Sequence, residues 1–388
     1  MTACKSMSEP FTPLTQLLEE GLTGGIYTAA VALAGVVGEL RWQAAVGRVS
    51  RDPGAQAATA ATVFDLASLT KPLATALALL LLMDDGRLTP AATLGEFLPQ
   101  AWLPPDKRSL SLGSLLAHRA GLPASEPFYQ EILMAPPGAR RALLPHLAAA
   151  SPLVQPPDTA TLYSDLGFML LQAVVETVSG LNLDRFCEER IYRPLGLEVL
   201  GFNPLSIRAQ AGPAPENRKS KIENRLYAAT ETGLIAGRRV CGEVHDENAW
   251  AAGGVAGHAG LFGRGIEVFH LVAAIYRAYQ GETGLPFSPA SVRRFLTPVA
   301  RGARALGFDT PDSEACRCSA GRYFSPLSVG HRGFTGVSFW LDLELGQMVV
   351  LLTNRVHLGR DDKAGIQAFR PRFHEAASLA LGFSRAFR

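Results

Sequence analysis

The feature that most constrains the fold is a leucine- and alanine-rich segment that has no polar face. Residues Leu73 to Met83 are leucine or alanine at all but two positions, and no glycine occurs between Ala67 and Asp85. This composition predicts one long helix over residues 67–85. The apolar stretch is roughly half as long as a bilayer-spanning helix, so we expect a helix buried inside the protein and no membrane span.

A helix without a polar face needs a large core around it, and the rest of the chain can supply one. Of the 388 residues, 47% are hydrophobic and 19% are charged, which excludes the composition of a disordered chain. The formal net charge is only +2 and no long run of lysine or arginine occurs, so we expect no nucleic-acid partner. The length predicts roughly two or three structural units.

Strand patterns lie near the two ends of the chain, and helical patterns lie between them. Residues 26–37 and 39–46 are apolar runs around a glycine turn, which predicts a β-hairpin. Residues 87–255 carry many prolines and glycines between short helical patterns, which predicts a helical insertion, with a solvated loop at 208–225. The C-terminal part is predicted to form two strands and a closing helix, at residues 333–341, 347–353 and about 362–381.

Several common catalytic patterns do not occur in the sequence. It contains no Gly-x-Ser-x-Gly, no His-Glu-x-x-His, no phosphate-binding loop and no Gly-x-Gly-x-x-Gly motif. Cys316 and Cys318 form one pair without a second pair at metal-ligand spacing, and the eight histidines are scattered. We therefore expect no metal and no cofactor.

One short motif at the start of the long helix indicates nucleophilic catalysis. Ser68-Leu-Thr-Lys71 places a hydroxyl and an ammonium three residues apart, and so on one face of a helix. A cation beside a serine favours its alkoxide, and a helix N-terminus supplies a backbone N–H for an oxyanion. The alternative is structural: Ser68 caps the helix and Lys71 extends to solvent.

Two further motifs follow in the order known from one enzyme family. Ser68-Leu-Thr-Lys71, Tyr163-Ser-Asp165 and His331-Arg-Gly333 together resemble the three active-site motifs of the penicillin-recognising serine hydrolases. That family includes class C β-lactamases, D,D-peptidases and related esterases. The segment from Leu115 to Pro123 is also similar, and His118 within it is expected to be a buried framework histidine.

The resemblance covers residues 20–385 and implies the fold. We expect an α/β plus all-α architecture, in which an antiparallel β-sheet is flanked by helices and carries a helical insertion, as in β-lactamases and transpeptidases. The α/β domain would comprise residues 15–86 and 256–388, and the mainly helical insertion domain residues 87–255.

Residues 244–262 and 351–357 resemble a narrower subgroup, whose characterised members act on peptidoglycan fragments as carboxypeptidases or as muramoyl-peptide amidases. Glycine at every third position from Gly254 to Gly263 indicates backbone packed too closely for a side chain, in a segment that lines the cleft. His258 within it is a candidate substrate contact. The alternative is a tight connection without a ligand role.

The resemblance implies a role for each motif residue. Ser68 is the nucleophile that carries the acyl group, and Lys71 is a cation that lowers the pKa of Ser68 and of Tyr163, with a proton relay through Lys71 itself as the alternative. Tyr163 is the general base and later the proton donor to the leaving group, for which its pKa has to fall by about 3 with the help of a second cation. The backbone N–H groups of Ser68 and Phe334 form the oxyanion hole, and Gly333 lets its strand approach the nucleophile.

Two substrate-side residues depart from the family pattern. His331 stands where true β-lactamases commonly have lysine, and a histidine is fully charged only below about pH 6.5. Arg332 is expected to point the other way, because side chains alternate along a strand. Asp165 stands where asparagine is most common, and its carboxylate suits Lys71 as a cation but repels a substrate carboxylate. Efficient β-lactam hydrolysis is therefore not expected.

The sequence thus predicts a metal-independent, class C β-lactamase-like serine hydrolase that forms an acyl-enzyme on Ser68. Its partner would be a small-molecule or muropeptide substrate, and a peptidoglycan-derived amide is favoured. The alternatives are a broad carboxylesterase or weak β-lactamase on the same site, and a slowly turning over penicillin-binding receptor. Residues 1–14 contain no apolar signal segment and the cysteines number five, so we expect a cytoplasmic protein; a trimmed leader would instead place it in the periplasm.

Overall fold

The computed structural model of the protein describes residues 9–203, 225–232, 237–298, 304–311 and 319–387. The loop expected at 208–225, apart from Arg225, lies outside these residues, and so does the pair Cys316 and Cys318.

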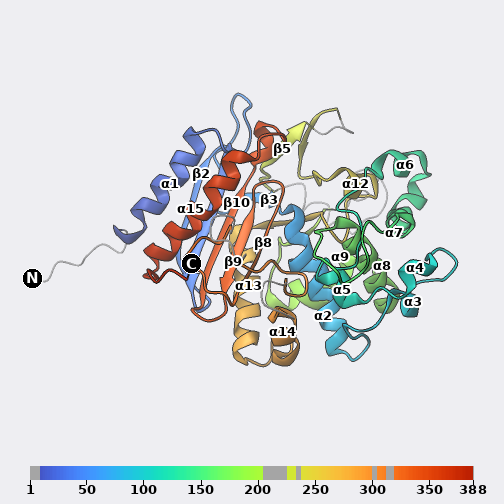
Figure 1. Ribbon diagram of the computed structural model, residues 1–388. Helices are drawn as coiled ribbons and strands as arrows, with labels where there is room; N and C mark the ends of the chain where they lie inside the picture. The colour runs from blue at the N-terminus through green and yellow to red at the C-terminus, as the bar shows by residue number, and fades with distance from the viewer. Residues whose placement is uncertain (1–8, 204–224, 233–236, 299–303, 312–318, 388) are drawn as a thin grey trace, which may run out of the picture.

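A five-stranded antiparallel sheet forms one side of the molecule (Figure 1). Its first two strands in sequence are the hairpin expected at the N-terminus, and the C-terminal strands join it because β10 pairs antiparallel with β1. In sheet order the strands are β2 (Glu39–Gly47), β1 (Ala29–Val36), β10 (Gln347–Thr353), β9 (Ser338–Asp342) and β8 (Ser328–Arg332).

Both faces of this sheet are covered, which explains why β10 is apolar at almost every position. Val350 and Leu352 face the main hydrophobic core, whereas Val349 and Leu351 face a second core on the other side of the sheet. The second core is covered by α1 (Thr12–Thr23) and by the closing helix α15 (Ala364–Ala380); α13 (Gly265–Gln280) packs against β1 and β10 on the main-core face (Figure 1).

The strand expected at 333–341 is wrong in its limits. Strand β8 ends at Arg332, residues 333–337 form a turn, and β9 begins at Ser338. The turn is closed by the Gly333 N–H, which donates to Val337 O at 2.8 Å, and Gly336 adopts a positive φ of 101° there. His331 and Arg332 therefore lie at the end of one strand and do not open the next. The prediction was wrong because apolar residues lie around Gly336 and the segment therefore resembles a continuous strand.

The long apolar helix is present and buried, as expected. It starts with a 3₁₀ turn at Ala67–Leu69, widens to a π-type turn at Lys71–Ala76, and continues as α2 (Leu77–Asp84). The stretch Ala67–Asp84 is long and apolar enough to cross a membrane, and so is the bent pair of helical segments Asp165–Ser179 and Leu183–Leu195; in the first, 83% of the residues are buried inside the protein.

Helices fill the space on the far side of α2 from the sheet (Figure 1). α8 (Asp165–Ser179) packs against α2, α5 and α7. One hydrophobic core includes residues of the sheet, of α2 and of α8, and the predicted division into two domains stays a prediction. The other helices here are α3 (Leu94–Phe97), α4 (Pro105–Arg108), α5 (Leu112–Leu116), α6 (Tyr129–Met134), α7 (Arg140–Ala150) and α9 (Leu183–Cys187).

Small elements connect the sheet to the helical part. A three-stranded sheet has the order β3 (Val63–Asp65), β7 (Leu261–Arg264), β4 (Gly201–Phe202), and it carries the chain directly into Ser68. Other strands and α-helices that the structure describes are β5 (Ala229–Thr232), β6 (Arg239–Cys241), α12 (Glu247–Ala251) and α14 (Pro289–Leu296).

Candidate active site

Ser68 and Lys71 form the centre of the candidate site. The Lys71 Nζ donates a hydrogen bond to Ser68 Oγ over 3.0 Å. Lys71 is completely buried, whereas Ser68 lines a cavity that opens to solvent. The alternative in which Lys71 extends to solvent is therefore wrong, and the pair has the geometry of a serine held beside a cation.

The Lys71 ammonium has two further partners. Its Nζ lies 2.7 Å from Asp165 Oδ1 and donates to the His258 backbone carbonyl at 3.2 Å. Burial lowers the pKa of Lys71, but the Asp165 carboxylate, followed by Tyr163, outweighs burial and the net pKa is raised. Lys71 is therefore a cation at neutral pH, in the state that Asp165 was expected to favour.

The backbone in front of Ser68 is strained. Ala67 has φ 47°, a left-handed conformation that a residue with a Cβ rarely adopts. Asp65 stabilises it, because Asp65 Oδ1 accepts from the Ala67 N–H at 2.8 Å and Asp65 Oδ2 accepts from the His245 N–H at 2.7 Å. This bend turns the chain from β3 into the helix and presents Ser68 at the cavity.

Tyr163 meets Ser68 and Lys71 from the helical side. The Lys71 Nζ lies 4.9 Å from the Tyr163 ring centroid. Burial raises the pKa of Tyr163, and the Lys71 charge and hydrogen bonds with Lys71 and Ser68 only partly oppose it. The expected fall in the pKa of Tyr163 is not found, so the phenol is protonated at neutral pH. A second cation is present, since the Arg304 guanidinium lies 5.3 Å from the ring centroid, but it is paired with Asp309.

His331, at the end of β8, faces the same cluster as a neutral imidazole. Its side chain is buried and its ring centroid lies 6.0 Å from that of Tyr163. Burial lowers the pKa of His331 to about 4, which the Asp309 carboxylate opposes. His331 Nδ1 donates to the Arg332 carbonyl at 2.8 Å, and the Arg332 side chain is half exposed and lies 3.5 Å from Asp309. A buried, neutral His331 agrees with the expectation that this position supplies no permanent cation.

Gly333 allows the turn after β8 to approach the nucleophile closely. A Cβ at this position would lie 2.4 Å from Val337 Cγ2, 2.9 Å from Leu66 O and 3.2 Å from Ala67 Cβ. The next residue, Phe334, lines the cavity. Its carbonyl accepts hydrogen bonds from Arg355 Nε and Nη2 at 3.2 and 2.9 Å, which fixes this part of the backbone. The turn thus packs against the backbone directly before Ser68, and Phe334 and Ser68 line the same cavity.

His118 braces Tyr163 from behind. Its carbonyl accepts from the Leu162 N–H at 2.8 Å and its Nδ1 accepts from the Ser164 N–H at 3.0 Å, so one residue binds the backbone N–H groups of the two residues that flank Tyr163. The two rings lie 4.5 Å apart. His118 is buried with φ 58°, and burial lowers its pKa well below the usual value, so the imidazole is neutral. The expected framework histidine is confirmed, and its place is at the site.

The glycine-rich segment contributes backbone to the site. A Cβ at Gly257 would lie 2.1 Å from Phe168 O, so the expected close packing is confirmed there. This packing brings the His258 carbonyl onto Lys71. The His258 imidazole is 2% exposed, and its Nε2 lies 2.9 Å from Asp246 Oδ1. The structure thus places the His258 backbone, and not its side chain, at the catalytic pair.

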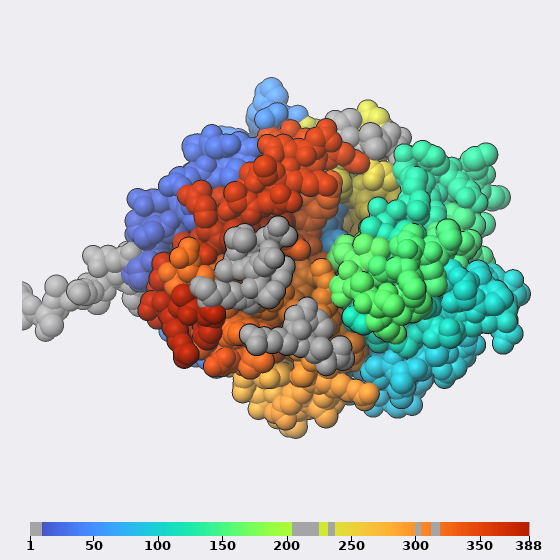
Figure 2. Space-filling model, viewed as in Figure 1, coloured from blue at the N-terminus to red at the C-terminus, as the bar shows by residue number. Residues whose placement is uncertain are grey.

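A cavity of about 430 Å³ contains the candidate site. Figure 2 shows the surface hollowed where the C-terminal part of the chain, in red and orange, faces the helical part, in green. Five of the lining residues carry a carboxyl group, and Arg360 also lines the cavity. Residues brought together here from the predicted set are Ser68, Tyr163, Asp165 and Phe334.

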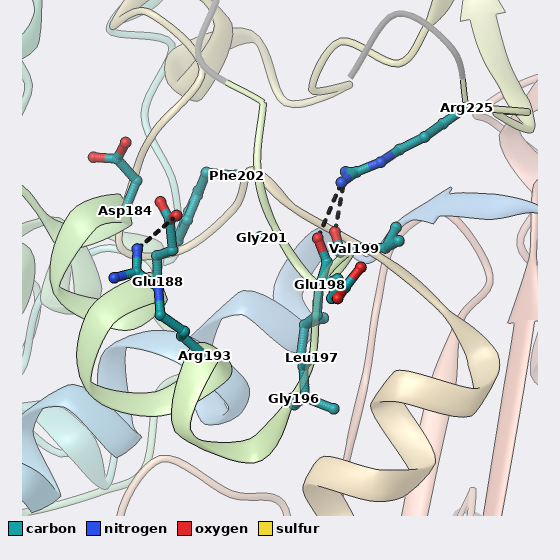
Figure 3. A pocket seen from close by; sticks show the side chains of 11 residues that line it. Asp184, Glu188, Arg193, Gly196, Leu197, Glu198, Val199, Gly201, Phe202 and Arg225 are labelled. Carbon is teal, nitrogen blue, oxygen red and sulfur yellow. Dashed lines mark hydrogen bonds and ion pairs between the residues drawn. The ribbon is translucent and has the colours of Figure 1, made fainter. Parts of the chain in front are cut away.

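A second pocket, of about 270 Å³, lies between the end of α9 and β4 (Figure 3). Its arginines are held by their neighbours: Arg225 donates to the carbonyls of Val199 and Glu198, and Arg193 pairs with Glu188 at 3.2 Å. None of the predicted site residues lines it. Over the described residues, no group of three or more His, Cys, Asp or Glu side chains is arranged to hold a metal ion.

Sequence comparison gives the same class of protein as the geometry, a serine hydrolase. The profile of the family described as Beta-lactamase matches residues 14–369. A protein of Escherichia coli (strain K12) named "Putative D-alanyl-D-alanine carboxypeptidase" is 34% identical over 314 residues, a match that covers 77% of this chain and 70% of that protein. The chain belongs to the beta-lactamase family.

Two solved structures share the fold over nearly the whole chain. The octameric penicillin-binding protein homologue from Pyrococcus abyssi has a TM-score of 0.69 at 18% identity and covers 95% of this chain and 77% of its own. EstCE1, described as a hydrolase with promiscuous acyltransferase activity, has a TM-score of 0.67 at 21% identity and covers 94% and 99%. At such identities the likeness shows the fold alone, and it confirms the expected antiparallel sheet flanked by helices.

Proposed function

We propose that this chain hydrolyses a peptidoglycan-derived amide through an acyl-enzyme on Ser68, as a D,D-carboxypeptidase or a muramoyl-peptide amidase. The observation that carries the proposal is the 3.0 Å contact between Lys71 Nζ and Ser68 Oγ, at the edge of a cavity that Tyr163 also lines. The name of the relative from Escherichia coli supports a peptidoglycan substrate.

In the proposed reaction, Ser68 Oγ attacks the scissile carbonyl and its proton passes to the Tyr163 phenolate. The backbone N–H groups of Ser68 and Phe334 bind the oxyanion. Tyr163 then gives the proton to the leaving amine as the carbonyl–nitrogen bond breaks, and the acyl group stays on Ser68. A water molecule then loses a proton to Tyr163 and attacks the acyl carbonyl, and Tyr163 returns this proton to Ser68 Oγ as the ester bond breaks and the acid leaves.

Lys71 acts as a fixed cation in this scheme. Its pKa is raised by Asp165, so it does not take the serine proton at neutral pH. Its charge instead stabilises the Ser68 alkoxide and the Tyr163 phenolate, both of which are negative on the reaction path. Because the Tyr163 phenol is protonated at rest, the reactive form is a minor population that grows with pH.

Purified muropeptides, incubated with the protein and analysed by mass spectrometry, test the proposal, with Ser68→Ala as the control. Ser68-dependent loss of a terminal D-alanine identifies a carboxypeptidase, and separation of the sugar from the peptide identifies an amidase. Turnover of simple esters without any muropeptide product would overturn the proposed substrate and favour a carboxylesterase. A stable penicillin adduct without turnover would favour a receptor.

A further inference from the structure

In the part of the chain that the structure describes, the cations that contact Ser68, line its cavity or lie beside Tyr163 are paired with carboxylates of the protein. Lys71 beside the nucleophile, Arg360 in the cavity wall, Arg304 beside the Tyr163 ring and Arg332 at the end of β8 all take part in ion pairs. The pairs are Lys71–Asp165, Arg360–Glu231, Arg360–Glu247, Arg304–Asp309 and Arg332–Asp309. A negatively charged group on a substrate would have to compete with these internal partners.

The other positive groups that the structure describes near the site are neutral, paired or outside the cavity lining. His331 is neutral because burial lowers its pKa to about 4. His245 lines the cavity, but its Nε2 lies 2.6 Å from Glu231 Oε1. Lys363 and Arg355 lie 5.0 and 4.9 Å from the Phe334 ring centroid, and neither of them lines the cavity.

Carboxyl groups outnumber cationic groups among the described side chains that line the cavity. Glu126 is half-buried at the cavity wall and makes no ion pair with any residue that the structure describes. Asp165 lies within two hydrogen-bond lengths of Ser68 Oγ, because both contact Lys71 Nζ. The lining carboxyl groups are Asp65, Glu126, Asp165, Asp246 and Glu247.

The leaving group of an amide or ester has to lie beside Tyr163, its proposed proton donor, and therefore close to Asp165 at the start of α8. We propose that the cavity selects substrates whose leaving group carries no free carboxylate, such as a D-alanyl amide or ester, over substrates that end in a free C-terminal acid. This inference rests on the proposed function and restricts its substrates to amides and esters whose leaving group carries no free carboxylate. Like charges at this range in a partly desolvated site oppose binding and reaction of the acid.

A matched pair of peptides tests the inference. Nα,Nε-diacetyl-L-Lys-D-Ala-D-Ala and its C-terminal carboxamide present the same acyl group and differ by one charge on the leaving group. At neutral pH and low salt, we expect kcat/KM for the carboxamide, from release of D-alaninamide, to exceed that for the acid by at least about 10-fold. The ratio should fall in high salt, which screens the repulsion. An equal rate or a preference for the acid would overturn the inference.

Charge-neutralising variants identify the residues responsible. Glu126→Gln and Asp165→Asn should each reduce the amide-to-acid ratio by about 3-fold or more, whatever their effect on the absolute rates. The matched control is Glu39→Gln, which removes the same single negative charge at an exposed position on β2. It should leave the amide-to-acid ratio unchanged. If the ratio is the same in wild type, Glu126→Gln and Asp165→Asn, the carboxylates do not select the substrate.

Failure of the proposed substrate class would be distinguishable from failure of this inference. If neither peptide is cleaved, the carboxypeptidase form of the proposed function fails, and the muropeptide assay described above tests the amidase form. Charge selection is then measured with two aryl acetates, one with a carboxylate on the phenol leaving group and one with the corresponding methyl ester. The inference still predicts a faster Ser68-dependent reaction for the methyl ester, and the reverse order would overturn it.

Discussion

The Lys71 ammonium and the Asp165 carboxylate lie 2.7 Å apart, although 94 positions separate them in the sequence. The contact joins the central helix to the first turn of α8 and closes the candidate site around Ser68. The contact also determines the protonation state of Lys71, because the Asp165 carboxylate keeps the ammonium charged although Lys71 is completely buried. The proton acceptor for Ser68 must therefore be another group, and Tyr163 is in place for it.

Asp165→Asn should destabilise the protein by leaving the Lys71 charge buried with only neutral partners. We expect the free energy of unfolding to fall by about 1–3 kcal/mol, less than for a fully buried pair because the Asp165 side chain is 23% exposed. A double-mutant cycle with Lys71→Met, measured by urea denaturation, isolates the pair. A coupling energy near zero would contradict a stabilising interaction between the two side chains.

The raised pKa of Tyr163 predicts an unusual pH profile. The phenolate is the active base, and its fraction grows about tenfold per pH unit while pH is below the pKa of Tyr163. The Ser68-dependent kcat/KM for an uncharged ester should therefore rise from pH 7 to pH 10 with a slope near one. Tyr163→Phe should cost about 10²–10⁴-fold and remove the slope. A plateau already at pH 7 would show that Tyr163 ionises normally or is not the base.

His118 is predicted to control activity through the position of Tyr163. His118→Phe keeps a ring at this site but removes the acceptor for the Ser164 N–H. We expect kcat/KM to drop by about 10–100-fold with the burst amplitude per folded protein retained, since the nucleophile is intact. His118→Asn, whose side-chain oxygen can accept and which tolerates a positive φ, should recover part of the rate.

Ser111→Ala is the control for His118, because it removes the N-cap of the preceding helix α5 without touching Tyr163. If Ser111→Ala and His118→Phe lose activity in proportion to their loss of folded protein, the role of His118 is only structural. Loss of rate without loss of folded protein in His118→Phe alone supports positioning.

Gly333→Ala adds only one methyl group but should lower both the stability of the protein and the rate of acylation. The new Cβ would contact Val337 and the backbone before Ser68 at distances that require the turn to move. We expect a stability loss of about 1–3 kcal/mol and a fall in acylation rate, because the Phe334 N–H moves with the turn. Gly138→Ala is the matched control, since a Cβ there meets nothing within 4 Å and the residue has no positive φ. Equal losses of stability and acylation rate in Gly333→Ala and Gly138→Ala would contradict the close packing of the turn at Gly333 against the backbone before Ser68.

Much of the fold could be predicted from local sequence patterns. The apolar segment of α2, the N-terminal hairpin and the run of β10 each reflect one physical requirement, burial on one or both faces. The β8–β9 turn was missed because its glycines lie between apolar residues that also suit a strand. The chain order of the three motifs indicated which residues meet, but not their electrostatic state.

The state of Tyr163 and the bend at Ala67 could not be predicted from the sequence. The pKa of Tyr163 depends on how much water the fold removes, and this depends on the packing of segments distant in sequence. An alanine in the sequence does not indicate a positive φ. The conformation of Ala67 depends on its hydrogen bond to Asp65 and on the turn at Gly333, which packs against it. Arg304, the second cation over Tyr163, lies in a part of the chain without any motif.

The central claim is that Ser68 becomes acylated, and pre-steady-state release of p-nitrophenol from p-nitrophenyl acetate tests it most directly. We predict a burst of about one equivalent per folded protein, followed by steady turnover, with a matching acetyl adduct on Ser68 by mass spectrometry. Ser68→Ala should show neither burst nor adduct. A wild-type protein that releases p-nitrophenol no faster than Ser68→Ala, or that acquires its acetyl group on another residue, would contradict the account.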